Sequence, residues 1–287
     1  MSDITAPAAV PSIQLADGRA IPQLGLGVWQ VADEIASDAV RVALDSGYRH
    51  IDTAAIYANE RGVGDGVRAS GLPREDVWVT TKLWNDDQGG IDSARRALEA
   101  SLERLGMDYV DLYLIHWASP ARDRYVETWK ALVQLRDEGL ARSIGVSNFH
   151  PEHLKRAIDA AGEVPAINQV ELHPYLQQRE LRAAHERLGI ATQGWSPLGQ
   201  GGELLADPVV VEIAGQLGSA ITPAQVVLRW HVQHGFVTIP KSQNAARIAA
   251  NIDLFGFVLD DDQMARLDAL DRGSAGRIGP DPATANF

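Results

Sequence analysis

Residues 77–117 read VWVTTKLWNDDQGGIDSARRALEASLERLGMDYVDLYLIHW. The stretch opens with a β-branched run at 77–81 and closes with a second apolar run at 110–115. Between the two runs, apolar residues recur at positions 94, 97, 98, 101/102 and 105, which is the spacing of one face of an α-helix. A strand, a helix and a second strand in this order predict two parallel strands joined by a right-handed crossover.

The same alternation runs along most of the chain. A hairpin is predicted at the Ala16-Asp17-Gly18-Arg19 turn. Strands are predicted at residues 25–28, 50–52, 77–81, 110–115, 143–146, 167–171, 191–195 and 237–239. Helices are predicted at residues 34–45, 60–69, 91–105, 125–138, 153–161, 179–188, 224–233 and 245–251, with starts also signalled at Thr222-Pro223 and Asp260-Asp261-Asp262.

Eight strand–helix units without an intervening linker predict one α/β domain over residues 1–287. The predicted fold is a (β/α)₈ TIM barrel with an N-terminal β-hairpin and a C-terminal loop or tail. The end of the chain has scattered glycines and prolines and no periodicity, so we expect residues 272–287, like residues 1–11, to be flexible.

Charge and composition exclude several classes of protein. The 287-residue chain carries 26 Lys and Arg against 38 Asp and Glu, and the net charge of −12 argues against nucleic acid as a partner. The absence of cysteine excludes disulfides, thiolate metal sites and cysteine nucleophiles, and it fits a reducing compartment. No secretory signal is present, and no apolar run approaches the roughly 18 residues that span a bilayer. We therefore expect a soluble, cytoplasmic monomer with no membrane partner.

Four polar side chains follow the ends of three neighbouring predicted strands. Asp52 ends the second strand with Tyr57 in the loop behind it, Lys82 follows the third strand, and His116 follows the fourth. In a barrel these strand ends meet at one rim. A lysine ammonium lowers the pKa of a nearby tyrosine, Asp52 would hold Lys82, and His116 could steer a carbonyl toward Tyr57. Such a set predicts a proton donor that works with a hydride donor.

Each of these residues also has an ordinary structural interpretation. A lone Asp at a strand end is more often a helix N-cap, and a lone Tyr is usually packed at the surface. A lone Lys is usually solvated, and a lone His usually satisfies a local hydrogen bond. Four compatible groups at one rim are much rarer by chance, but their spacing alone leaves both interpretations open.

Four stretches make the sequence resemble the aldo-keto reductase superfamily, most closely its bacterial members of the 2,5-diketo-D-gluconate reductase type. They are DSGYRHIDTA at 45–54, LYLIHW at 112–117, GVSNF at 145–149 and IPKS at 239–242. The similarity extends from about residue 11 to residue 271. The resemblance implies that Tyr57 is the general acid, that Lys82 and Asp52 tune it, and that His116 orients the carbonyl.

The family binds its nicotinamide cofactor without a Rossmann unit. The sequence agrees, since the glycines at 25 and 27 lack the third glycine of that motif, and the glycines at 62, 64 and 66 are interpreted as local helix punctuation. The resemblance implies that Trp195 stacks on the nicotinamide and that the glycine-rich loop at 199–202 closes over the pyrophosphate. The implied cofactor residues are Ser147, Asn148, Gln169, Trp195, Ser196, Leu198, Lys241, Ser242, Arg247 and Asn251.

The cofactor implied is NADPH rather than NADH. Lys241, Ser242 and Arg247 follow the last predicted strand, and two cations with a hydroxyl suit a terminal phosphate monoester. Taken singly, each is more often a solvated surface residue. Asn251 matches an adenine-contacting position, whereas Ala250 stands where the family often carries Glu, so adenine or ribose contacts could be weaker here.

The resemblance also implies an aromatic pocket for a small-molecule carbonyl substrate. Trp29, Trp84, His116 and Trp117 would line it beside Tyr57. Ala118 replaces the proline that usually follows His-Trp in the family, so this loop could sit differently. The tail, which helps set substrate choice in relatives, carries no motif that identifies a substrate.

Three functions are weighed by these residues and their spacing. The leading hypothesis is NADPH-dependent reduction of aldehydes or ketones to alcohols, with small carbonyls, diketones or keto-sugars as substrates. The second is a cofactor-sensing binding protein, as in the potassium-channel β-subunit branch, and the third is a metal-dependent barrel hydrolase. No metal is expected, because the pairs His150/His153 and His231/His234 lack a third ligand and an exposed helix face explains both.

Overall fold

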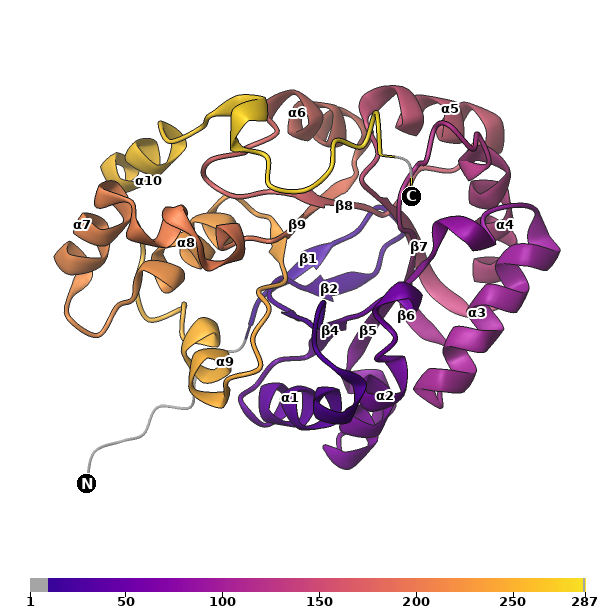
Figure 1. Ribbon diagram of the computed structural model, residues 1–287, viewed down its shortest axis with the longest axis horizontal. Helices are drawn as coiled ribbons and strands as arrows, with labels where there is room; N and C mark the ends of the chain where they lie inside the picture. The colour runs from indigo at the N-terminus through magenta and orange to yellow at the C-terminus, as the bar shows by residue number, and fades with distance from the viewer. Residues whose placement is uncertain (1–9, 286) are drawn as a thin grey trace.

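Eight parallel strands form the centre of the computed structural model, which describes residues 10–285 and 287 (Figure 1). They follow one another in chain order around the sheet. Parallel bridges from Leu24 to Thr238 and from Gly27 to Lys241 close the sheet between its first and last strands. The strands are β3 (Leu26–Gly27), β4 (His50–Asp52), β5 (Trp78–Leu83), β6 (Val110–Ile115), β7 (Ala141–Ser147), β8 (Ile167–Glu171), β9 (Ala191–Trp195) and β10 (Val237–Thr238). The predicted (β/α)₈ barrel is confirmed.

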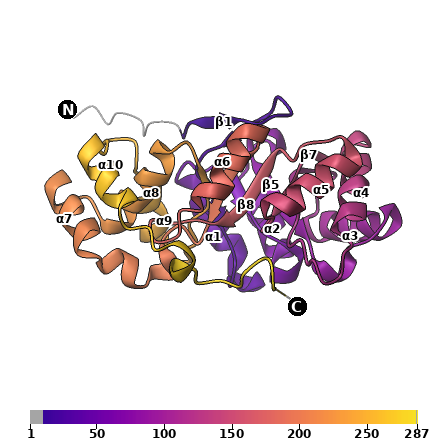
Figure 2. The ribbon, with the colours of Figure 1, turned by 90° about the horizontal axis from the view of Figure 1, so that it is seen from above.

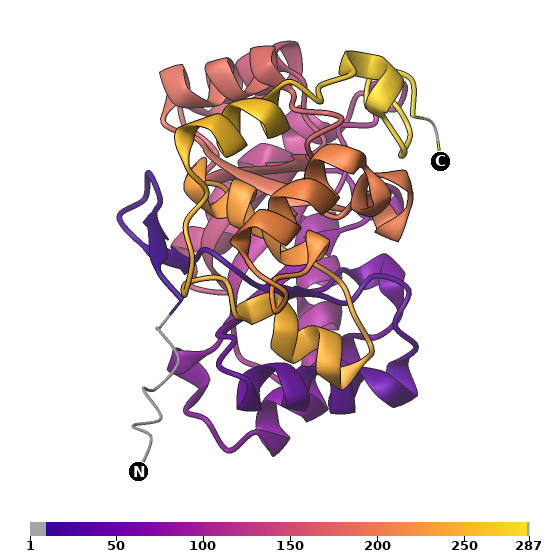
Figure 3. The ribbon, with the colours of Figure 1, turned by 90° about the vertical axis from the view of Figure 1, so that its left-hand side faces the viewer.

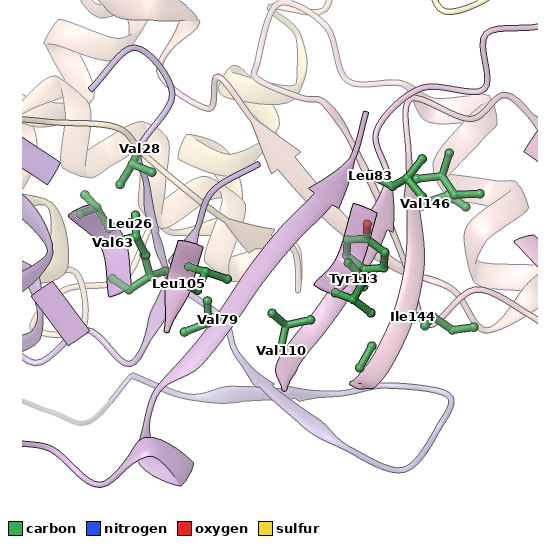
Figure 4. Close-up of a cluster of buried hydrophobic side chains, with 14 of the residues drawn as sticks. Leu26, Val28, Val63, Val79, Leu83, Leu105, Val110, Tyr113, Ile144 and Val146 are labelled. Carbon is green, nitrogen blue, oxygen red and sulfur yellow. The ribbon is translucent and has the colours of Figure 1, made fainter. Parts of the chain in front are cut away.

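Helices surround the barrel, as Figure 1 shows. Their apolar faces pack on the outer face of the strands, and Figure 4 shows part of this core around Val79, Leu105 and Tyr113. The helices are α1 (Asp33–Asp45), α2 (Glu60–Ala69), α3 (Ile91–Leu105), α4 (Tyr125–Asp137), α5 (Pro151–Ala161), α6 (Arg179–Leu188), α7 (Pro208–Leu217), α8 (Pro223–Gln233), α9 (Ala245–Ile252) and α10 (Asp261–Asp268). Within the described part of the chain, none of them has the length and apolarity needed to cross a bilayer.

Helix starts were predicted well where a capping residue marks them. Thr222 Oγ1 accepts a hydrogen bond from the Gln225 amide at 3.2 Å, and the Gln225 side chain accepts one from the Thr222 amide at 2.9 Å. Asp260 and Gln263 cap α10 in the same reciprocal way. These side chains satisfy backbone N–H groups that a helix start otherwise leaves unpaired.

Helix α7 was missed by the sequence analysis. Its run Val209-Val210-Val211 is β-branched, which is typical of a strand rather than a helix. The local signals that override this preference are Asp207, whose side chain accepts a hydrogen bond from the Val209 amide, and Pro208 at the first helical position.

The two ends of the barrel differ. The hairpin of β1 (Ser12–Gln14) and β2 (Ala20–Pro22) covers one end, where the buried side chains of Leu15 and Ile21 pack on Leu112 and Leu114. Figures 2 and 3 show the hairpin on one side of the molecule and the C-terminal tail on the opposite side. The tail side is the one toward which the strands run, so the functional end is the end that the hairpin leaves open.

The C-terminal tail follows a defined path. Apart from a single 3₁₀ turn at η6 (Gly273–Gly276) it is irregular, as predicted, but its backbone hydrogen-bonds to the barrel, beginning with the Arg272 amide on the Tyr175 carbonyl at 2.9 Å. The flexibility expected for residues 1–9 lies outside the described residues.

The glycines of α2 have a different role from the predicted helix punctuation. They face the neighbouring helices, and a Cβ on Gly62 or Gly64 would overlap the carbonyl oxygen of Asp33 in α1 or of Leu105 in α3. Glycine is therefore required because backbone from another helix occupies the space of a side chain.

We predict that Gly64→Ala lowers the free energy of unfolding by about 3 kcal/mol, because the new methyl group must push α2 away from α3. Urea denaturation followed by circular dichroism measures this change. As the matched control, Gly215→Ala in the exposed part of α7 meets nothing within 4 Å and should be neutral or stabilising by up to about 1 kcal/mol. Equal stability of the Gly64→Ala variant and the wild type would contradict the close-packing role.

Candidate active site

The C-terminal ends of the strands surround one cavity of about 1060 Å³. Lys82 alone among the sequence-predicted site residues does not line it, because its side chain lies fully buried below the cavity floor. The predicted residues that line it are Trp29, Asp52, Tyr57, Trp84, His116, Trp117, Ser147, Asn148, Gln169, Trp195, Ser196, Leu198, Lys241, Ser242, Arg247 and Asn251. The structure therefore gathers side chains from across more than two hundred residues of sequence into one site.

Lys82 is the centre of the polar cluster at the floor. Its Nζ donates hydrogen bonds to Asp52 Oδ1 at 2.6 Å, to the Thr53 carbonyl at 2.8 Å and to the Tyr57 hydroxyl at 3.4 Å. Asp52 is 2% exposed, so the ion pair is almost entirely shielded from water. The predicted pairing of Asp52 with Lys82, and the approach of Lys82 to Tyr57, are present in the structure.

The ionisation of Tyr57 reflects two opposing effects, the charge of Lys82 and burial. Burial raises the pKa of Tyr57 above its usual value near 10, and this outweighs the opposing effect of Lys82, while the Asp52 charge raises it further. Lys82 thus lowers the pKa of Tyr57 as predicted, but burial, which the sequence analysis did not consider, has the larger and opposite effect. Burial by itself lowers the pKa of Lys82, but Asp52 and Tyr57 together raise it, so Lys82 stays protonated. Tyr57 thus keeps its proton at neutral pH.

His116 lies edge-on to both Tyr57 and Trp84, with ring centroids 5.7 and 5.2 Å away. Burial, assisted by the positive charge of Lys82, lowers its pKa well below the usual 6.5. Its Nδ1 is buried with no hydrogen-bond partner among the described residues. A neutral imidazole still carries one N–H, so His116 can donate a hydrogen bond to an oxygen in the cavity.

Asn59 supports this arrangement and was missed by the sequence analysis. Its fully buried side chain donates to the carbonyls of Val28 and Val31 at 2.8 Å each and accepts a hydrogen bond from Thr53 Oγ1 at 2.7 Å. Asn59 thereby ties the loop that carries Trp29 to the segment that carries Tyr57. Because Asn59 lies two residues after Tyr57, the sequence could have suggested a role near the site. Its partners, the carbonyls of Val28 and Val31, are distant in the sequence and are evident only from the fold.

Polar side chains from β7 to β9 extend the site away from Tyr57. Gln169 Nε2 donates to Asp52 Oδ2 at 2.7 Å, and Ser147 Oγ donates to the Gln169 carbonyl at 2.8 Å. Asn148 Oδ1 accepts a hydrogen bond from Trp195 Nε1 at 2.9 Å, which fixes the indole at the cavity wall. Amide and hydroxyl groups beside a flat indole face fit a carboxamide-bearing aromatic ring such as nicotinamide.

Part of the cavity lining is cationic. Lys241 and Arg247 are exposed there and make no salt bridge with any residue that the structure describes. Ser242 Oγ accepts hydrogen bonds from the Asn244 amide at 3.1 Å and from Arg247 Nε at 3.4 Å. Two cations that lack a carboxylate partner fit the phosphate of NADPH. The predicted glycine loop forms η4 (Gly199–Gly201), and its residues Gln200 and Gly201 also line the cavity.

The walls nearest Tyr57 are aromatic. Phe287, which the sequence analysis did not select, stacks on Trp84 with ring centroids 5.8 Å apart and an interplanar angle of 9°, and it meets Trp117 edge-on at 5.1 Å. Asn85 Nδ2 donates to the Phe287 carbonyl at 3.1 Å. Since Phe287 is 202 positions from Asn85 along the chain, no local pattern could have predicted this contact.

Neither histidine pair lies on an exposed helix face, contrary to the prediction. His231 is fully buried and packs edge-on against Trp230, and His153 is 5% exposed and accepts a hydrogen bond from the His150 amide. His234 contacts Asp268 at 2.9 Å and is half-buried. Among residues 10–285 and 287, we find no cluster of three His, Cys, Asp or Glu side chains that could hold a metal ion.

Comparisons with known proteins agree with this geometry. The model of the aldo/keto reductase family matches residues 23–272. An aldo-keto reductase of Mycolicibacterium smegmatis is 56% identical over 277 residues, which cover 96% of this chain and 98% of the relative. The methylglyoxal reductase DkgA of Escherichia coli is 50% identical over 271 residues, which cover 94% and 96%.

Solved structures give the same result. A variant of Gox0644 in complex with NADPH has a TM-score of 0.92 at 49% identity and covers 99% of this chain and 100% of its own. A Bombyx mori aldo-keto reductase in complex with NADP has a TM-score of 0.87 at 38% identity, covering 97% and 98%. The chain belongs to the aldo/keto reductase family and is an oxidoreductase. The family resemblance predicted from the sequence is confirmed.

We predict that His116 stays neutral at pH 6.5, where a free imidazole is half protonated, because its burial and the nearby Lys82 charge penalise the imidazolium form. Nitrogen chemical shifts of labelled histidine measure the charge state, and His116→Asn identifies the resonance. The urea-denatured chain is the control, since its histidines should titrate near 6.5. A folded-state His116 resonance that titrates near that value would contradict the prediction.

Proposed function

We propose that the protein reduces aldehydes and ketones to alcohols, with NADPH as the hydride donor and Tyr57 as the proton donor. The observation that carries this proposal is the hydrogen bond of the buried Lys82–Asp52 pair to Tyr57, at the floor of a cavity whose lining includes aromatic side chains and the cations Lys241 and Arg247. In the overall reaction, the carbonyl carbon gains a hydride and the carbonyl oxygen gains a proton, while NADPH becomes NADP⁺.

The proposed role of each residue follows from its position in the cavity. Bound NADPH supplies the hydride to the carbonyl carbon. Tyr57 holds a proton at its hydroxyl and releases it to the carbonyl oxygen as negative charge develops there. The ammonium of Lys82 stabilises the phenolate that remains, and the neutral N–H of His116 orients the carbonyl toward Tyr57.

The cofactor proposal is supported by both the site and the relatives. Ser147, Asn148 and Gln169 present amide and hydroxyl groups beside Trp195, where they would hold the nicotinamide. Solved relatives at 49% and 38% identity are complexes with NADPH and NADP. Lys241 and Arg247 would contact the terminal phosphate that distinguishes NADPH from NADH. Loss of the usual acidic residue at Ala250 leaves this phosphate site intact.

Small carbonyl compounds are the proposed substrates. Relatives that are 50% identical are named methylglyoxal reductases, which act on a compact dicarbonyl. Trp29, Trp84, Trp117 and Phe287 enclose an apolar space beside Tyr57 that suits a compact aldehyde, diketone or keto-sugar. The monomeric state and the cytoplasmic location expected from the sequence stay predictions.

We predict that Tyr57→Phe lowers kcat for NADPH-dependent carbonyl reduction by about 10²-fold or more, because only the proton-donating oxygen is removed. The NADPH dissociation constant, measured by quenching of tryptophan fluorescence, should change little. Absorbance of reduced nicotinamide at saturating methylglyoxal measures kcat. The assignment of Tyr57 would fail if kcat of this variant stayed close to that of the wild type.

We predict that Arg247→Ala weakens NADPH binding by about 10- to 100-fold, since a charge-assisted contact to phosphate is lost. NADH lacks this phosphate and should bind the variant and the wild type almost equally. Fluorescence titration with each nucleotide gives both constants. An equal loss for the two nucleotides would exclude contact of Arg247 with the phosphate.

A further inference from the structure

Glu171 is a fully buried carboxylate that the proposed reaction does not use. It ends β8, and its two oxygens accept hydrogen bonds from two successive backbone amides of the C-terminal tail: Ile278 to Oε1 at 2.7 Å and Gly279 to Oε2 at 2.8 Å. The buried ring of His173 makes a further hydrogen bond to Oε1 at 2.9 Å. Hydrogen bonds to an ionised acceptor are among the stronger ones in proteins, and here they join the tail to the barrel.

This junction lies where the tail reaches the cavity. Gly279 and Pro280 line the cavity directly after the contact, and Phe287 lines it further along the chain. Gly279 lies so close to Trp195 that a Cβ there would be 2.5 Å from the indole ring. The hydrogen bonds to Glu171 therefore hold the tail at Ile278 and Gly279, where it enters the cavity lining beside Trp195. From there the tail continues to Phe287, which packs on Trp84 and Trp117.

The two salt bridges that the tail makes within the described residues are weaker candidates for this role. Arg272 reaches Glu203 at 3.1 Å, but the Glu203 side chain is 75% exposed. His150 and Asp281 are 3.6 Å apart at the surface. Exposed pairs of this kind contribute little because water and salt screen them. Burial of Glu171 removes that screening. Oε1 also contacts His173, but the Gly279 amide is the one hydrogen-bond partner of Oε2 among the described residues, so displacement of the tail would leave a buried carboxylate oxygen unpaired.

We propose that Glu171 is a positioning residue, which holds the C-terminal tail across the mouth of the cavity and so sets how tightly the carbonyl substrate is enclosed. This inference rests on the proposed function for its kinetic consequence. Glu171 touches no reacting atom, so it acts on substrate binding through the tail rather than on the hydride or proton transfer.

The direct test is Glu171→Gln, which keeps the shape of the side chain but removes its charge and replaces one acceptor oxygen with a donor amide. We expect hydrogen–deuterium exchange of the tail around Ile278 and Gly279, measured by mass spectrometry, to become at least about 10-fold faster. With methylglyoxal as the probe, KM should rise by about 10-fold while kcat changes by less than about 2-fold.

Two further variants make the test specific. Glu203→Gln, which removes the exposed carboxylate that contacts Arg272, should leave tail exchange and KM unchanged. Gly279→Ala keeps Glu171 but adds a methyl group that meets Trp195 and the carboxylate, so it should displace the tail and raise KM as Glu171→Gln does. Gly279→Ala also provides an answer if Glu171→Gln fails to fold.

The outcomes separate the two proposals. Unchanged tail exchange in both Glu171→Gln and Gly279→Ala overturns the positioning role. Faster exchange with an unchanged KM overturns the effect on substrate enclosure, and so does an equal loss in kcat and kcat/KM. If the wild-type protein oxidises no NADPH with any carbonyl, the proposed function fails, whereas the exchange experiment still tests whether Glu171 holds the tail.

Discussion

The buried ion pair of Lys82 and Asp52 constrains the rest of the active site. A buried ammonium is tolerated only when its three protons are satisfied, and here Asp52, Thr53 and Tyr57 accept all of them. Asp52 lies on β4 and Lys82 on β5, where Asp52 pairs with Thr80. A one-residue slip between these strands would move Lys82 to the other face of the sheet. The register of the barrel and the chemistry of its floor are therefore linked.

Much of this organisation could be predicted from the sequence because it is repetitive or local. The alternation of β-branched runs and helical patterns predicted the barrel, and the rule that strand ends meet at one rim brought Asp52, Lys82 and His116 together. The cofactor residues were found only through the family resemblance, since polar residues such as Ser147 or Asn148 are unremarkable alone. Their individual roles stay predictions, although the structure places them along one cavity.

What the sequence could not provide depends on contacts between distant segments. Ile278 and Glu171 are 107 positions apart, so the tail predicted to be flexible could not be connected to β8 in advance. The close approach of α3 to Gly64 and the burial that raises the pKa of Tyr57 are likewise properties of the packed molecule. Helix α7 was missed for a local reason. The β-branched residues 209–211 favour a strand, and the capping residue Asp207 with Pro208 overrides this preference.

The opposite placement of the hairpin and the tail matters for handling the protein as a biocatalyst. The hairpin covers the end of the barrel away from the cavity, on the side of the molecule opposite the C-terminus (Figure 2). Phe287 lines the cavity, and its carbonyl accepts a hydrogen bond from Asn85. An affinity tag or a solid support joined ahead of the hairpin would leave the entrance unobstructed. The same attachment joined after Phe287 would emerge within the entrance and pull on the aromatic wall. The fold thus determines the end by which the enzyme should be immobilised.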